Sequence, residues 1–359
     1  MRTLVISDLH LGRADRRDLL RRPDLREPLL KALDDVDRLV ILGDGLELRE
    51  AAHREATHYA GEFFKDIGRA LGPDKELIVL AGNHDHGLAA GWIDARLLSE
   101  PSGFLGLEER YEAAGPLTRQ LVEAARPARL QFAYPGIWLR EDVYAMHGHY
   151  SDLHATVPTF ERVIVGAMGK WVAPFPPDRA TPDDYEAVLS PVYAWLHALT
   201  QRADHSVVAK GGGASSSAYT ALTRRSPRAL ALRTGYRGAI AALNAAGLGP
   251  LQANLSPSAL RRGYLTGIQE VARRLNIGAD YLIWGHSHRS GPWPTDDPQE
   301  WAGIVNTGSW VYQPHFLSSE PNGSPYWPGT AVLVNDTGPP ELRRLLGDRG
   351  HEELRPRPV

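Results

Sequence analysis

The chain has 359 residues, which is enough for one large α/β domain with an insertion or for two domains. It has no cysteine, which excludes disulfides, thiolate metal ligands and cysteine nucleophiles, so nitrogen and oxygen atoms must hold any metal. The formal net charge of −3 gives no general attraction to nucleic acid, and we therefore expect no general nucleic-acid binding.

Strand and helix patterns alternate through the first part of the chain. We predict them in the order strand 3–7, helix 25–35, strand 38–43, helix 50–71 and strand 76–81. This alternation favours an α/β fold in which strands and helices form separate layers.

The first residues of the chain and the length of its apolar runs indicate an expected cellular location. Thr3 already begins a strand and a polar motif follows at Asp8, which leaves no room for a secretory signal peptide. No apolar run reaches the roughly 20 residues that a membrane-spanning helix needs. We expect a cytoplasmic protein, and peripheral membrane contact stays open.

The pattern changes after His147, where prolines and aromatic residues become frequent. No clear strand returns before residue 279, and Ser256 followed by Pro257 is typical of a helix start. The helix-like segments lie near 183–203, 215–225, 235–247 and 256–276.

This change of pattern divides the chain into predicted domains. We interpret residues 158–255 as a mostly helical insertion, and residues 1–157 with 256–345 as the core domain. The run Gly211-Gly212-Gly213 lacks the Lys-Ser/Thr that follows the glycines of a P-loop, so we interpret it as a flexible loop. Residues 346–359 are predicted to be a charged tail that frays.

Five short polar motifs each follow an apolar, strand-like run. Each motif alone also fits an ordinary turn, because Gly and Asp are frequent in turns. Ligand sites in layered α/β proteins lie at the carboxyl ends of strands, so five such motifs in succession indicate a site for two metal ions that share one carboxylate. The motifs are Asp8-Leu9-His10, Gly43-Asp44, Gly82-Asn83-His84-Asp85, His147-Gly148-His149 and Gly285-His286-Ser287-His288.

With these five blocks in order, the chain resembles the calcineurin-like metallophosphoesterases, whose signature runs Asp-x-His, Gly-Asp, Gly-Asn-His-Asp/Glu, His and Gly-His-x-His. The resemblance implies a layered metallophosphoesterase β-sandwich flanked by helices, with the helical insertion as a cap over the site. Within the superfamily, Asp8-Leu9-His10-Leu11-Gly12, Gly43-Asp44-x-x-Glu47 and His147-Gly148 look most like UDP-2,3-diacylglucosamine pyrophosphohydrolases. Those enzymes tend to read His-Gly-Asp where this chain reads His147-Gly148-His149, which leaves the substrate open.

The resemblance also implies which residues bind metal. One divalent ion would be held by Asp8, His10, Asp44 and His288, and the other by Asp44, Asn83, His147 and His286. The shared carboxylate of Asp44 offsets the repulsion between two dications about 3.5–4 Å apart. Imidazole, carboxylate and amide ligands accept Mn, Fe, Zn, Co or Ni, and among these we expect Mn.

The expected reaction is hydrolysis of a phosphoester, with a phosphodiester or a pyrophosphate favoured. A hydroxide that bridges the two metal ions would attack phosphorus in line. By resemblance, His84 faces the oxygen of the leaving group as a general acid or charge stabiliser. We expect Asp85 to hold the His84 ring in orientation, as carboxylates often do for such rings.

Three further residues have two interpretations each. Arg13 either binds a substrate phosphate or belongs to a solvated helix start. Glu47 either lines the pocket or favours a helix N-terminus. His149 either contacts the substrate or points elsewhere from the end of its strand.

The substrate is expected to be a small-molecule or lipid-linked phosphate. The same metal centre would also serve a phosphomonoesterase, a nuclease or a cyclic-nucleotide phosphodiesterase. A non-catalytic binding scaffold is the alternative from another class, but scaffolds of this fold lose several ligands and this chain keeps all of them. The motifs act on phosphate and the insertion selects what is attached to it, so the motifs leave the substrate open.

Overall fold

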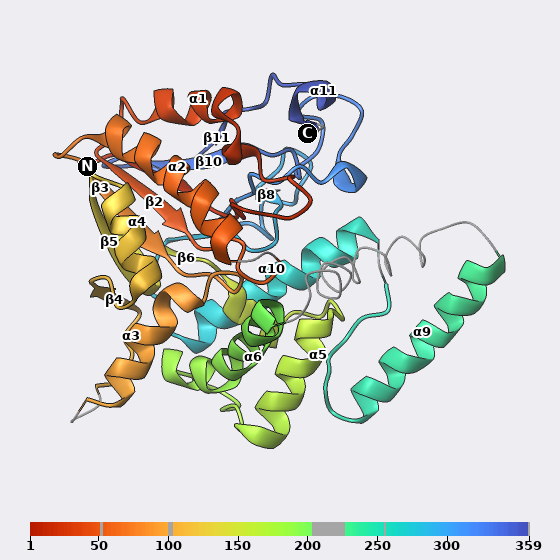
Figure 1. The fold of residues 1–359 in the computed structure, drawn as a ribbon. Coiled ribbons are helices and arrows are strands. Elements are labelled where there is room, and N and C mark those ends of the chain that lie inside the picture. The colour runs from red at the N-terminus through yellow and green to blue at the C-terminus, as the bar shows by residue number, and fades with distance from the viewer. Residues whose placement is uncertain (51–52, 100–102, 203–226, 255, 358–359) are drawn as a thin grey trace. The chain divides into compact units, whose positions relative to one another are not determined.

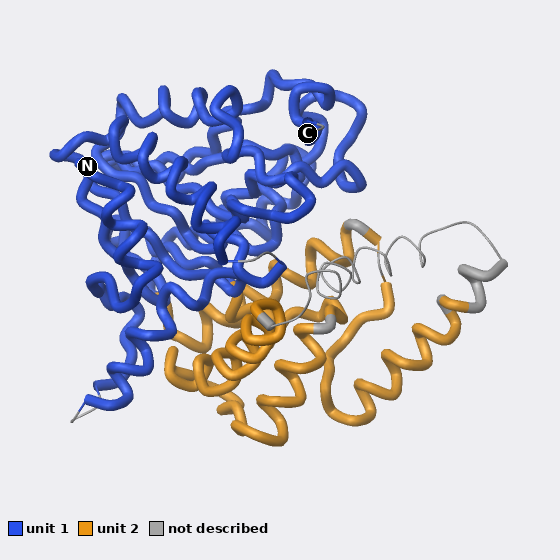
Figure 2. Tube along the Cα trace, viewed as in Figure 1, with its two compact units in different colours: residues 1–148, 278–359 blue, residues 149–277 orange. Residues whose placement is uncertain are grey.

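The computed structural model describes residues 1–50, 53–99, 103–202, 227–254 and 256–357 (Figure 1). The chain divides into two compact units, one of residues 1–148 with 278–359 and the other of residues 149–277 (Figure 2). The predicted insertion 158–255 falls within the second unit. The predicted helix near 215–225 and the glycine run 211–213 lie outside the described residues.

All the described strands belong to the first unit. They are β1 (Thr3–Ile6), β2 (Arg38–Leu42), β3 (Glu76–Leu80), β4 (Glu108–Tyr111), β5 (Arg129–Arg140), β6 (Val143–Met146), β7 (Tyr281–Trp284), β8 (Ser290–Gly291), β9 (Ile304–Thr307), β10 (Thr330–Val334) and β11 (Glu341–Arg344). Hydrogen bonds connect them in the order β11-β10-β1-β2-β3-β5-β6-β7-β9-β8, and β4 pairs with β5.

The long strand β5 joins the two halves of this sheet. Its residues Arg129–Ala133 pair in parallel with β3, and its later residues Gly136–Arg140 pair antiparallel with β6. Buried side chains from both halves, among them Val40 of β2 and Ile283 of β7, form one apolar cluster. The two halves therefore pack face to face as a β-sandwich.

Successive side chains of a strand enter two different cores. In β2, Val40 and Leu42 belong to the cluster between the sheet halves, whereas Leu39 and Ile41 belong to a larger cluster that also contains helix residues. This is the alternation expected of a strand, with both faces buried. It explains why the sequence reads as an unbroken apolar run at this strand.

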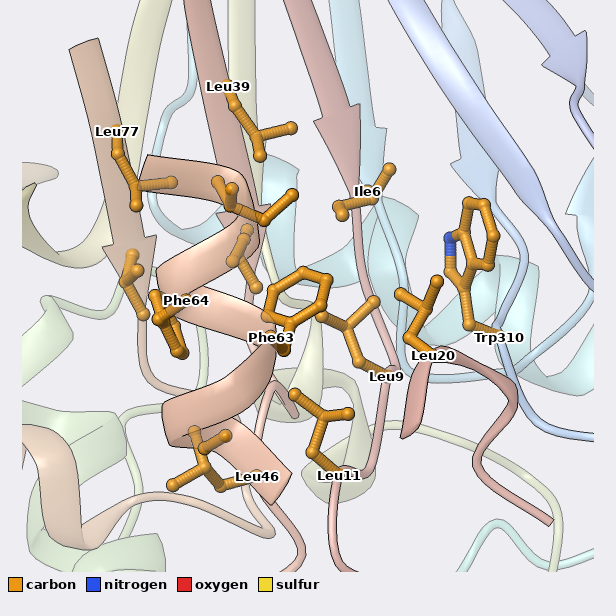
Figure 3. Packing of buried hydrophobic residues seen from close by; sticks show 14 of the residues in the cluster. Ile6, Leu9, Leu11, Leu20, Leu39, Leu46, Phe63, Phe64, Leu77 and Trp310 are labelled. Atoms are coloured by element: carbon orange, nitrogen blue, oxygen red, sulfur yellow. The ribbon is translucent and has the colours of Figure 1, made fainter. Parts of the chain in front are cut away.

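Helices cover the outer face of the first sheet half. Figure 3 shows Phe63 and Phe64 of α2 among Leu39 and Leu77 of the sheet, and all four are fully buried. Each such side chain contributes roughly 1.5–3 kcal/mol to folding. The helices of this unit are α1 (Pro23–Ala32), α2 (His53–Leu71), α3 (Gly87–Leu97), α4 (Pro116–Ala124) and α11 (His351–Leu354), with the 3-10 turns η1 (Leu19–Arg21) and η4 (Pro314–Phe316).

The described part of the second unit is helical and contains no strand. The hydroxyl of Ser256 accepts a hydrogen bond from the backbone N–H of Ala259, which confirms the predicted N-cap of α10. Among the described residues, no helix is both long and apolar enough to span a membrane. The elements are η2 (His149–Leu153), α5 (Phe160–Ala167), the π-helical turn η3 (Met168–Val172), α6 (Pro182–Arg202), α9 (Pro227–Ala245) and α10 (Pro257–Arg274).

The chain end differs from its prediction. Residues 346–359 were expected to fray, but Leu346 and Leu354 are fully buried, and Leu354 closes the short helix α11. His351 Nε2 lies 2.8 Å from the carbonyl oxygen of Ser318, and Arg22 Nη1 donates to the carbonyl of Glu353 at 2.6 Å. Two apolar anchors in a charged segment are enough to hold its described part, 346–357, against the first unit.

Candidate metal centre

The predicted ligands lie just beyond the carboxyl ends of five strands in the first unit. Asp8 and His10 follow β1, Asp44 follows β2, Asn83 follows β3, His147 follows β6, and His286 and His288 follow β7. Within each half of the sheet the relevant strands run parallel, because β1 pairs with β2 and β2 with β3, while β6 pairs with β7. The side chains therefore meet at one edge of the sandwich.

The backbone at these positions is unusual. Few residues other than glycine adopt a positive φ. Each such residue costs about 1–3 kcal/mol, and it keeps this conformation only where the surrounding structure imposes it. Five of the predicted ligands have a positive φ: Asp8 (54°), His10 (47°), Asp44 (50°), His286 (64°) and His288 (57°). The backbone is therefore strained at the residues that direct these side chains toward one another, which is typical of a functional site.

Glycines of the motifs leave the room that the ligands need. A Cβ on Gly82 would lie 2.6 Å from the backbone nitrogen of Asp44 and 2.8 Å from His147 Nε2. A Cβ on Gly285 would lie 2.5 Å from Asp8 Oδ2. Both distances are shorter than real contacts allow, so these glycines are required by close approach.

The first group of candidate ligands consists of Asp8, His10 and His288. His288 Nε2 lies 3.3 Å from Asp8 Oδ1 and 3.1 Å from His10 Nε2. His10 Nε2 also lies 3.6 Å from Oδ2 of Asp44, which links this group to the next. These are the four residues assigned to the first ion from the sequence.

The second group consists of Asp44, His147 and His286, with Asn83 beside them. His147 Nε2 lies 3.4 Å from Asp44 Oδ2. The Asn83 side chain lies 3.2 Å from His147 Nε2 and 3.1 Å from His286 Nδ1. Asp44 therefore stands between the two groups, as a bridging carboxylate must.

Hydrogen bonds fix which ring nitrogen faces the centre. His10 Nδ1 lies 2.9 Å from the Glu47 carboxylate, which can only accept, so the proton is on Nδ1 and the lone pair of Nε2 faces the other ligands. His147 Nδ1 donates to the carbonyl oxygen of Leu42 at 2.9 Å, so Nε2 is the ring nitrogen that faces the other ligands. Such partners hold the rings of metal-binding histidines in the required tautomer.

The electrostatics of the site favour positive charge between its ligands. Burial opposes ionisation of Asp44, but the rings of His147, His84 and His10 hold the pKa of this carboxyl well below its usual value. Burial likewise disfavours a charged His147, yet Asp44 and Asp8 raise its pKa to about 10. Burial and the nearby His84 lower the pKa of His10 to about 4, which leaves His10 neutral and able to bind a metal.

The donor set fits divalent metal ions. Oδ1 of Asp8 is buried, and its nearest polar neighbour among the candidate ligands is His288 Nε2 at 3.3 Å. The Nε2 atoms of His10 and His288 lie 3.1 Å apart, close enough for both rings to bind one ion. Nitrogen and oxygen ligands of this kind suit Mn, Fe, Zn, Co or Ni.

His84 lies at the edge of the centre and is held by Glu47. Its Nδ1 donates to both oxygens of the Glu47 carboxylate, at 2.8 and 3.0 Å. Burial disfavours charge on the ring, but Glu47 and Asp44 outweigh it and raise the pKa of His84 to about 9. The ring is therefore protonated at neutral pH, and Glu47, fully buried, orients both His84 and His10.

The predicted role of Asp85 is wrong. Its carboxylate accepts from the backbone N–H groups of Asp44 (3.2 Å), Leu46 (3.1 Å) and Gly82 (2.7 Å), so it ties two ligand loops together. Asp85 stays next to His84 in the chain, but its buried oxygens are turned toward these loops. Burial first, and then Asp44, raise the pKa of this carboxyl to about 6.

The remaining predicted residues occupy different places. Arg13 donates to Asp15 at 2.9 and 3.0 Å and lies 3.3 Å from Glu50, so acidic side chains already surround its guanidinium. His149 is buried and belongs to the second unit, where its ring lies 4.9 Å from that of Tyr150 and 5.7 Å from that of Tyr193.

One residue beside the candidate ligands, Arg49, belongs to none of the sequence motifs. Arg49 lies 2.8 Å from the Asn83 amide through Nη1, and its charge lowers the pKa of His84. Its own backbone N–H donates to Glu47 at 3.0 Å. The only signal in the sequence was its position two residues after Glu47, which matches no part of the five motifs.

Comparison with known proteins identifies a family for the chain. The family described as calcineurin-like phosphoesterase matches residues 1–290, a range that includes every candidate ligand. No curated protein matches the chain. Among solved structures, the chain is similar to the cold-active protein-tyrosine phosphatase of a psychrophile, Shewanella sp., with 13% identity, 93% of this chain and 75% of that chain covered, and a TM-score of 0.28. A TM-score this low does not indicate a shared fold or function.

Proposed function

Because the chain belongs to the calcineurin-like phosphoesterase family, whose members are metal-dependent hydrolases, we propose that it hydrolyses a phosphodiester or a pyrophosphate at a centre of two divalent ions. The observation that carries this proposal is the pair of ligand groups joined through Asp44. Asp8, His10 and His288 lie on one side of that carboxylate, and His147 and His286 on the other.

In the proposed centre Asp8, His10, Asp44 and His288 hold one ion, and Asp44, Asn83, His147 and His286 hold the other. We favour Mn, and the same ligands accept Fe, Zn, Co or Ni. Two such ions, when bound, lower the pKa of a shared water and bind the phosphate oxygens on which negative charge develops.

The protein itself supplies orientation and a proton. Glu47 fixes the direction of the His84 ring through Nδ1, which leaves Nε2 of that ring to face the oxygen of the leaving group. Because Glu47 and Asp44 raise the pKa of His84 to about 9 against the effect of burial, its Nε2 carries a proton to donate at neutral pH. We also propose that Arg13 and His149 contact the substrate.

The second unit has exposed apolar side chains that could bind an apolar group of the substrate. Its exposed side chains include Trp171 (60% exposed) and Val172 (67%) on η3, and Trp195 (50%) and Leu199 (44%) on α6. These exposed apolar residues support a lipid-linked phosphate as substrate, or peripheral contact with a membrane. The likeness of the motifs to the UDP-2,3-diacylglucosamine pyrophosphohydrolases points in the same direction.

A substrate panel tests the proposal. Purified protein is assayed with Mn²⁺ and with chelator on phosphomonoesters, phosphodiesters, nucleotide-sugar pyrophosphates with and without acyl chains, and single-stranded DNA. We expect Mn-dependent cleavage of diesters or pyrophosphates, faster when acyl chains are present. Preference for monoesters or for DNA would overturn the proposed substrate class, and hydrolysis that survives chelation would overturn the metal centre.

A further inference from the structure

The side-chain amide of Asn83 lies between two sets of partners. On one side are the candidate ligands His147 Nε2 (3.2 Å), His286 Nδ1 (3.1 Å) and Asp44 Oδ2 (3.3 Å). On the other side is Nη1 of Arg49, at 2.8 Å. One end of the amide is a carbonyl oxygen that accepts, and the other is an NH₂ group that donates.

The two sets of partners make opposite demands on this amide. A metal ion can bind Asn83 only through the carbonyl oxygen, which must then face His147 and His286. In that orientation the NH₂ group faces the guanidinium of Arg49, and two donors 2.8 Å apart repel each other. With the amide turned over, the oxygen accepts from Arg49, and the NH₂ group faces Asp44 Oδ2 and the two rings.

We propose that Arg49 competes with the metal ion for the carbonyl oxygen of Asn83, so that metal binding turns the amide and redirects the Arg49 guanidinium to a phosphate oxygen of the substrate. The inference rests on the proposed function, because it takes Asn83 as a ligand and a phosphate as substrate. It assigns Arg49 two linked roles, one in each state of the centre.

The position of Arg49 suits the second role. Its backbone N–H holds the same Glu47 oxygen that accepts from His84, and its charge acts on the His84 ring. The guanidinium therefore lies close enough to His84, the group assigned to the leaving-group oxygen, for its charge to act on that ring. A guanidinium also binds two phosphate oxygens at once, which an amide cannot do.

This arrangement couples metal binding to phosphate binding. The metal-free enzyme keeps Arg49 on Asn83, and the loaded enzyme offers it to the substrate. By linkage, phosphate must then strengthen metal binding by the same factor by which metal strengthens phosphate binding.

The first test is a double-mutant cycle on metal affinity, measured by calorimetric titration of Mn²⁺ into chelator-stripped protein. We expect Arg49→Met to tighten binding of the second ion by about tenfold, because the ion no longer has to displace a charged hydrogen bond. In an Asn83→Asp background the same substitution should change affinity less than about twofold. An aspartate has two equivalent oxygens, one for the ion and one for Arg49.

The cycle separates this inference from simple charge repulsion. If Arg49→Met tightens binding equally in both backgrounds, the effect is only removal of a nearby positive charge and the competition is refuted; no change in either background refutes it as well. Arg54→Met, an exposed arginine on α2, removes the same charge at the surface and should leave metal affinity unchanged. Thermal unfolding shows whether each variant folds, and Arg49→Gln replaces Arg49→Met in the cycle if the latter does not.

The second test measures inorganic phosphate binding to the Mn-loaded protein. We expect Arg49→Met to weaken binding about tenfold, as for loss of a charged hydrogen bond, with Arg54→Met unchanged. Unchanged phosphate affinity in Arg49→Met would overturn the second role. Neither test needs turnover, so a positive result stands even if the substrate panel overturns the proposed substrate class.

Discussion

Asp44 is the residue on which both ligand groups depend. Its Oδ2 lies 3.6 Å from His10 Nε2 and 3.4 Å from His147 Nε2. Asp44→Ala should abolish hydrolysis and lower the total bound metal, because two ions that lose their shared carboxylate are under-coordinated and repel each other. Metal analysis of the purified variant, with a folding control by circular dichroism, checks this. Near-normal metal content together with near-normal turnover would contradict the assignment of Asp44.

His84 allows chemistry to be separated from metal binding. It is assigned to the leaving group, so His84→Ala should lower turnover by roughly 10²–10⁴ while metal content stays intact. The loss should shrink for substrates with good leaving groups such as nitrophenol, which need no proton. Equal losses for all leaving groups, measured side by side at saturating Mn²⁺, would show that His84 has another role.

The sequence names the candidate ligands, which the structure brings together in groups that could hold metal ions, but it shows few of the contacts that orient them. The ligands stand in short motifs after strands, so order and residue type identify them. Glu47 was named as a possible pocket residue, but its contact with His84 and that of Arg49 with Asn83 join residues far apart along the chain, and no spacing rule reports such contacts. Asp85 was assigned wrongly because a neighbour in sequence was taken for a neighbour of the ring.

Among the elements, the first strands of the sheet were predicted, whereas the long strand β5 was not. The strands predicted at 3–7, 38–43 and 76–81 match β1, β2 and β3. The strand β5 was missed because Pro135 and Gly136 at its middle are typical of a turn. In the structure that point is where β5 leaves β3 and begins to pair with β6, which a sequence pattern alone does not show.

The loop after β3 gives a prediction at the level of the element. Gly82→Ala should lower metal content and activity, because the new Cβ must displace the Asp44 backbone or the His147 ring. Gly61→Ala on α2 is the matched control, since a Cβ there meets nothing within 4 Å. That control should keep full metal content and gain about 0.5–1 kcal/mol in stability. Metal analysis and thermal unfolding measure both, and a metal-replete Gly82→Ala would contradict the close approach.

At the level of the whole molecule, the sequence predicted two parts with different compositions, and the chain does divide into two compact units. The second unit, 149–277, begins two residues after the ligand His147 and ends shortly before β7. Its role as a cap that selects the substrate stays a prediction. Composition marks a helical insertion, but what a surface recognises depends on which side chains packing leaves exposed.

Substitutions of Trp171 and Phe175, which are four residues apart, can distinguish substrate recognition from packing in that unit. Phe175 lies 4.8 Å from the ring of Tyr185 and 5.5 Å from that of His154, whereas Trp171 is 60% exposed and has Lys170 Nζ over its ring at 5.3 Å. Phe175→Ala should therefore lower the free energy of unfolding by about 1–3 kcal/mol, less than for a fully buried aromatic, and should affect all substrates alike.

Trp171→Ala should leave thermal stability and the hydrolysis of a small chromogenic ester unchanged, because little of its surface is buried. If the second unit binds an apolar group of the substrate, kcat/KM for an acylated pyrophosphate should nevertheless fall, by about tenfold for one aromatic contact. The comparison is made with acylated and deacylated forms of the same substrate, so that only the apolar group differs. Should Trp171→Ala slow both forms equally, or unfold at a clearly lower temperature, Trp171 serves the fold and the proposed recognition by this unit fails.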